Sequence, residues 1–102
     1  MSRWITNRTF FETFKKTVAT ADTAEKLHSD LPIPDGFQLI IKALDGNTGD
    51  VEYASSQAKA QGTNAFILDS GQSVGLRITN ANLVWIDVTV NAEGVVCSVE
   101  QY

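Results

Sequence analysis

The stretch SVGLRITNANLVWIDVTVNAEGVVCSVE, residues 73–100, decides the fold of this chain. Apolar side chains recur there at every second position, in three runs that are separated by turn sequences rich in Asn and Gly. The apolar positions are Val74, Leu76 and Ile78, then Val84, Ile86, Val88 and Val90, then Val95, Cys97 and Val99. A period of two is typical of a strand with one buried face. Residues 73–100 therefore predict three strands that follow one another through short turns.

The same pattern continues toward the N-terminus. Within residues 37–43, the apolar phase of every second residue alternates with Gln38 and Lys42, which indicates a strand. The cluster Asp45–Asp50 has turn composition, and Val51 and Tyr53 alternate with Glu52, which predicts a second strand and a hairpin. Shorter strands are predicted at residues 66–68 and 16–21, and residues 55–64 are expected to form a loop. Strands that recur every 8 to 12 residues indicate a sandwich or barrel, and the lack of a long helical stretch among them excludes a βαβ layout.

We therefore expect an all-β protein with one β-sandwich of jelly-roll type at residues 17–102, preceded by a short N-terminal arm at residues 1–16. A chain of 102 residues with 43% hydrophobic residues is large enough for one core. The expected core positions share the inward phase of the alternation and are Leu39, Ile41, Val74, Leu76, Ile78, Val84, Ile86 and Val88. Residues expected on the other faces are Gln38, Lys42, Arg77, Asp87 and Thr89.

Targeting and redox signals are few. No stretch has the length of about 18 apolar residues that a membrane span needs, and the N-terminus lacks the apolar region of a secretory signal. We therefore expect no membrane partner. The single cysteine, Cys97, lies in an apolar run and excludes an internal disulfide, so we interpret it as a buried structural thiol in a reducing or neutral compartment.

Catalytic and metal-binding patterns are weak. The only histidine, His28, is adjacent in sequence to Ser29 and close to Asp30, which is poor geometry for a catalytic relay. Oxygen-bearing side chains of the Asp45–Asp50 segment resemble part of a calcium loop, but Ser56 stands where an EF-hand needs Glu. A hairpin turn accounts for that segment. We expect no enzymatic activity, no catalytic residues, no cofactor and no metal.

The N-terminal arm differs from the body in charge and in pattern. Residues 1–16 carry four basic side chains and one acidic one, whereas residues 17–102 carry four basic and eleven acidic side chains. The arm also holds four aromatic residues that need burial, three of them at helical spacing. We expect the arm to dock on an adjacent protein surface through Arg3, Trp4, Arg8, Phe10, Phe11 and Phe14. The alternative is an arm folded back across its own sandwich.

The charge balance also bears on other ligands. Because the body is acidic and the arm has only four cations, we expect no nucleic-acid partner. Trp85 lies on the outward phase of its strand, and exposed aromatic residues mark either interfaces or sugar sites. We favour contact with a neighbouring subunit and keep a glycan-binding module as the alternative.

Residues 17–99 resemble the small structural proteins of tailed bacteriophages. The resemblance lies in a series of strand and turn segments: Thr17–Ala21, Ala24–Leu27, Ile33–Gly36, Ile40–Ala43, Asn47–Val51, Asn64–Leu68, Ser70–Val74 and Val84–Asp87. It covers about four fifths of the chain and includes no catalytic signature. Such proteins resemble decoration, cement or tail-associated subunits, and the segments do not distinguish among these roles.

The resemblance implies a location and partners. It implies a virion structural protein, most simply a capsid decoration or cement subunit that binds the major capsid protein or another virion protein. We expect a homo-oligomer, with a trimer as the first expectation, because Trp85 and the aromatic arm exceed what one small domain can cover. The alternatives are a glycan-binding module and an adhesion protein of the tail or baseplate.

Overall fold

The computed structural model describes residues 10–102 of the chain, which fold into eight strands and two short helical segments. The strands are β1 (Glu12–Thr17), β2 (Glu25–Lys26), β3 (Phe37–Ala43), β4 (Val51–Ala54), β5 (Phe66–Leu68), β6 (Ser73–Leu76), β7 (Trp85–Val88) and β8 (Gly94–Gln101). The helical segments are α2 (Gln57–Ala60) and the 3-10 helix η1 (Ala81–Leu83). At four and three residues, neither of these is long enough to cross a membrane.

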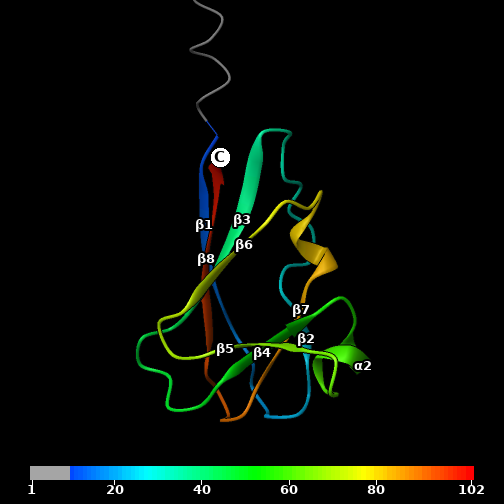
Figure 1. The fold of residues 1–102 in the computed structure, drawn as a ribbon, viewed down its shortest axis with the longest axis vertical. Coiled ribbons are helices and arrows are strands. Elements are labelled where there is room, and N and C mark those ends of the chain that lie inside the picture. Colours follow the sequence, from blue (N-terminus) through cyan, green and yellow to red (C-terminus); the bar gives the residue numbers. More distant parts are fainter. Residues whose placement is uncertain (1–9) are drawn as a thin grey trace, which may run out of the picture.

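The strands form two antiparallel four-stranded sheets (Figure 1). Sheet 1 has the order β1-β8-β3-β6 and sheet 2 has the order β2-β7-β4-β5. Apart from β4 and β5, strands that follow one another in the chain lie in different sheets. This alternation is that of an eight-stranded jelly roll, and it confirms the predicted β-sandwich.

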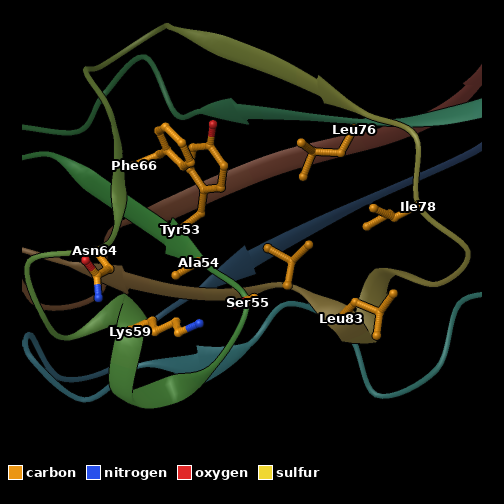
Figure 2. A pocket seen from close by; sticks show the side chains of 10 residues that line it. Tyr53, Ala54, Ser55, Lys59, Asn64, Phe66, Leu76, Ile78 and Leu83 are labelled. Atoms are coloured by element: carbon orange, nitrogen blue, oxygen red, sulfur yellow. The ribbon is translucent and has the colours of Figure 1, made fainter.

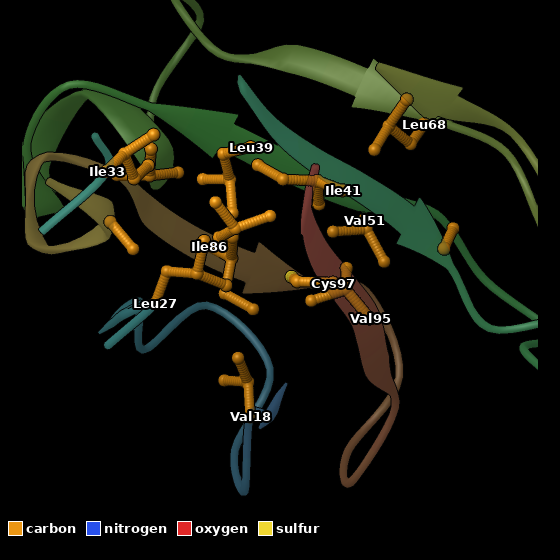
Figure 3. Packing of buried hydrophobic residues seen from close by; sticks show 14 of the residues in the cluster. Val18, Leu27, Ile33, Leu39, Ile41, Val51, Leu68, Ile86, Val95 and Cys97 are labelled. Atoms are coloured by element: carbon orange, nitrogen blue, oxygen red, sulfur yellow. The ribbon is translucent and has the colours of Figure 1, made fainter. Parts of the chain in front are cut away.

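The core fills the space between the two sheets (Figure 3). Of the eight expected core residues, five are buried, namely Leu39, Ile41, Val84, Ile86 and Val88. The other three, Val74, Leu76 and Ile78, are half-buried and pack against the cluster from one side. Their alternation placed them on the correct face, but β6 is an edge strand, so the sheet covers them from one side only.

One long edge of the sandwich is closed. There β1 of sheet 1 lies against β2 of sheet 2, and the Lys16 ammonium binds the Glu25 carboxylate at 2.7 Å. The rings of Phe14 and His28 pack edge to face with centroids 5.0 Å apart along the same edge. The lysine lowers the pKa of Glu25, and so does the hydrogen bond that its carboxylate accepts from the backbone of Ala19.

The beginning of the body differs from the prediction. Residues 12–16 do not stand apart as an arm or form a helical turn, because they make up most of β1 and pair with β8 along its length. The strand predicted at 16–21 is also wrong beyond residue 17, where Val18 enters the core and the chain turns. Helical spacing of Phe10, Phe11 and Phe14 was ambiguous because three aromatics cannot fix a period.

Two further predictions need correction. The expected hairpin of residues 37–43 with 51–53 is wrong, since β3 pairs with β6 and β8 while β4 pairs with β5 and β7. The connection instead carries the chain from one sheet to the other. Asp87 lies on the outward phase as expected, yet it is fully buried, at 0% exposure.

The predicted turn at residues 45–50 is held by a partner distant in sequence. The Glu93 carboxylate accepts hydrogen bonds from the backbone N–H groups of Thr48 and Gly49 at 2.7 and 2.9 Å. These bonds lower the pKa of Glu93. The side chain of Asn47 donates to the carbonyl of Gly94 at 2.9 Å. These contacts join the turn to the residues at the start of β8.

Candidate functional site

The second long edge of the sandwich, between β5 and β6, is open and forms a groove of about 570 Å³ (Figure 2). Its lining comes from both sheets and from η1, and consists of Tyr53, Ala54, Ser55, Lys59, Asn64, Phe66, Leu76, Ile78, Leu83 and Val84. The volume lies in the range of about 300–1,000 Å³ that is common for ligand sites. We refer to these ten residues as the open-edge groove.

Aromatic side chains form one end of the groove. Tyr53 and Phe66 are directly opposite each other on β4 and β5, and their rings stack with centroids 5.5 Å apart. Phe66 shares the inward face of β5 with the buried Leu68, but it is 68% exposed. An inward-facing phenyl group is therefore left uncovered at this edge. Burial raises the pKa of the Tyr53 hydroxyl above its ordinary value of 10.0.

Aliphatic side chains form the other end. Leu76 and Ile78 lie across this part of the groove from Leu83 (Figure 2), and Val84 also lines it. The position of Leu83 is set by Asn80, whose side-chain oxygen caps η1 by accepting from the N–H of Asn82 at 2.9 Å. The same oxygen accepts from the N–H of Leu31 at 3.0 Å. Asn80 thereby ties η1 to the segment before β3.

Polar groups lie along the rim. Ser56 caps α2 by accepting from the N–H of Lys59 at 3.2 Å, and this short helix places the Lys59 side chain at the groove. Figure 2 shows the side chains of Lys59 and Asn64 at the aromatic end. Within residues 10–102, Lys59 makes no ion pair. The rim thus offers a cation and an amide to a ligand that rests on an apolar floor.

The groove lining offers hydrogen-bonding groups and one ammonium group. The described lining has a phenol, a hydroxyl, an amide and an ammonium group, but no carboxylate or imidazole that could act as a base beside them. His28 packs on Phe14 at the closed edge. Among residues 10–102, no three His, Cys, Asp or Glu side chains are grouped to ligate a metal. Cys97 is buried in the core, and burial raises the pKa of its thiol to about 12.

Of the seven residues that the sequence suggested for partner binding, the structure describes four. Arg3, Trp4 and Arg8 lie outside the described residues. Phe10 packs edge to face on Phe37 with centroids 5.6 Å apart, and Phe14 packs on His28. Both are therefore in contact with their own domain.

Two other suggested residues differ from these. Phe11 is 66% exposed just before β1. Trp85 is half-buried on the outward face of sheet 2, and the Lys26 ammonium lies 5.6 Å from its ring centroid. Within the described region, Phe11 is the most exposed apolar side chain of that set, and Phe10 is also exposed, at 38%. None of Phe10, Phe11, Phe14 and Trp85 lines the groove.

Sequence reasoning did not identify the groove residues. Phe66 was assigned to a strand, but the alternation does not reveal which strand lies at an open edge. The helix that presents Lys59 has a recognisable signal, because Ser56 is a favoured N-cap before a run containing two alanines. Leu83 stands just before β7 and has the opposite phase to the inward-facing Val84 and Ile86. This is a weak sign that its side chain is exposed.

Comparison with known proteins adds no relative to these observations. No protein-family description, curated protein or solved structure in the comparisons matches this chain.

Proposed function

We propose that this chain is a non-enzymatic structural subunit of a virion, of the decoration or cement type, and that it docks through its open-edge groove. The observation that carries the docking part is the uncovered inward face of β5 and β6, where Phe66 is 68% exposed although it points between the sheets. A small domain gains stability when a partner covers such apolar surface, because burial removes it from water.

The virion part of the proposal rests on the resemblance to phage structural proteins and is compatible with the fold. Eight-stranded jelly rolls occur in viral capsid domains and in lectin domains, so the architecture suits either role without choosing between them. A cement subunit binds the assembled shell and not its free components, which stabilises the shell by mass action. Repetition on a symmetric lattice lets a modest contact per copy suffice.

A matched pair of variants tests where the docking surface lies. Phe66 and Phe11 are the same residue type, are exposed to 68% and 66%, and lie near opposite edges of the sandwich. In a co-sedimentation assay with the particle whose genome encodes this chain, Phe66→Ala should reduce the bound fraction and Phe11→Ala should leave it unchanged. Melting temperatures of both variants check that the domain stays folded.

The converse result would exclude the groove as the docking surface. Loss of binding in Phe11→Ala with normal binding in Phe66→Ala would place docking at the N-terminal side, as the sequence alone suggests. Binding that is unaffected by either variant would contradict both versions. A protein that never co-sediments with the particle would contradict the virion role itself.

A glycan-binding module is the second candidate, and the stacked Tyr53–Phe66 pair favours it. Sugar rings pack against aromatic faces, and the rim supplies Lys59 and Asn64 as hydrogen-bond donors. This function requires affinity of the isolated protein for saccharides. Titration with a saccharide panel, followed by NMR shifts at the groove residues, distinguishes it from cement, for which no saccharide should shift them.

A further inference from the structure

The outward face of sheet 2 carries two carboxylate side chains directly opposite each other. Glu52 of β4 and Asp87 of β7 are paired in the strand register. Side chains at such positions project from the same face, with Cβ atoms about 4.5–5.5 Å apart. Like charges in this position repel each other, so this pair is unfavourable when both side chains are ionised.

Asp87 is the more constrained of the two. It is fully buried, and its Oδ1 accepts a hydrogen bond from the N–H of Val88 at 2.8 Å. Its Oδ2 is also buried and has no hydrogen-bond partner within residues 10–102. A buried acceptor without a donor is costly, particularly when it shares a negative charge. A donor beside Oδ2 would remove that cost.

The surroundings of the pair supply little positive charge. The elements packed against β7 are β2, β4, β8 and α2. Their charged side chains are otherwise engaged: Glu25 binds Lys16, Lys26 lies over Trp85, Lys59 lines the groove and Glu100 accepts from Ser98. Two more carboxylates, Asp22 and Asp50, act on Glu52 in the same sense as Asp87.

We propose that Glu52 takes up a proton and donates its O–H to Asp87, and that this hydrogen bond stabilises the packing of sheet 2 as the solution becomes mildly acidic. A protonated Glu52 carboxyl can donate its O–H to the unpartnered Oδ2 of Asp87. One proton then removes both the repulsion and the missing hydrogen bond. This device is separate from the groove, since Glu52 alternates with Tyr53 and faces the other way.

The direction of the pH effect follows from Glu52. Burial raises the pKa of Glu52 above its usual 4.5, and Asp87, Asp22 and Asp50 add to the rise. At Glu52, the folded state therefore binds more protons than the unfolded state at pH values above 4.5. Stability should decrease as the pH rises from 4.5 through the folded-state pKa of Glu52, and recover when acid is added back.

Carboxyl ¹³C NMR of the full chain tests the pair directly. Glu52 should titrate with a midpoint above 4.5 in the native protein. In Asp87→Asn the midpoint should move down toward 4.5, because the amide is neutral and its nitrogen donates to the Glu52 carboxylate. An unchanged Glu52 midpoint in Asp87→Asn would overturn the proposal.

A second variant decides the matter if Asp87→Asn fails to fold. Glu52→Gln replaces a half-buried side chain and keeps a donor for Asp87 at every pH. Its melting temperature should exceed that of the wild type at pH 7 and should vary less between pH 5 and 7. Glu100→Gln, an exposed change on the other sheet, should keep the wild-type dependence. A Glu52→Gln variant whose melting temperature keeps the wild-type pH dependence would also overturn the proposal.

Discussion

Truncation of Ile86 to alanine should destabilise the domain severely, because this side chain lies at the centre of the core. Ile86 is 0% exposed and pairs across the sheet with Glu25 on one side and Tyr53 on the other. Removing its buried carbons without collapse of the surroundings costs about 2–5 kcal/mol. A domain of this size has a total stability of about 5–15 kcal/mol, so the loss is a large share of it.

The matched control is Ile67→Ala. Ile67 lies in β5 of the same sheet but is 56% exposed, so its truncation should cost at most about 1 kcal/mol. Urea unfolding followed by tryptophan fluorescence gives both values from the midpoints, provided that the slopes agree. If Ile86→Ala unfolds the chain, Ile86→Val should still show a loss of about 0.5–1.5 kcal/mol. Equal costs for Ile86→Ala and Ile67→Ala would refute the assignment of the core.

Three other features make separate predictions. Gly94→Ala should reduce the free energy of unfolding by about 1–3 kcal/mol and lower the melting temperature, because a Cβ there overlaps the Lys16 backbone across the β1–β8 pair. In Gly46→Ala the added Cβ meets open space, so this variant should be tolerated. Similar melting temperatures for the two variants would contradict the pairing. Cys97 should resist alkylation in the native protein at pH 8 and react once urea unfolds the chain, because burial raises the pKa of its thiol to about 12. Rapid alkylation of Cys97 in the native protein, measured by mass spectrometry, would contradict this prediction. Because hydrogen bonds lower the pKa of Glu93, its stabilising effect is present above pH 4.5 and is lost as the pH falls through its folded pKa. Glu93→Gln should therefore be less stable than the wild type at pH 7, and its melting temperature should fall less on acidification. Parallel curves of melting temperature against pH for the two proteins would argue against this role.

The pattern of inward and outward residues was predictable from sequence because it is local. Val74 and Leu76 alternate with Ser73, Gly75 and Arg77, and a strand must turn the apolar phase toward the core whatever its partner. The partners themselves were not predictable in this way. The connection between β3 and β4 has turn composition, which is compatible with a hairpin and equally with a crossing between sheets. Only contacts between residues distant in sequence, such as Glu93 with Thr48, decide which one forms.

The open-edge groove escaped prediction for the same reason. Phe66 and Leu68 have the same phase in one strand, yet one is exposed and the other buried, because coverage depends on where β6 runs relative to β5. Asp87 shows the reverse case, an outward-facing charge that is nevertheless buried. Alternation gives the direction of a side chain, and burial follows only when the neighbouring elements are known.

An electron-microscopy map of the particle whose genome encodes this chain tests the central claim most directly. The account predicts regularly spaced copies of the jelly roll on the particle, with the edge formed by β5 and β6 packed on a neighbouring subunit so that Phe66 and Leu83 are covered. A particle that lacks the chain, or copies whose β5–β6 edge faces solvent while another surface makes the contact, would contradict it.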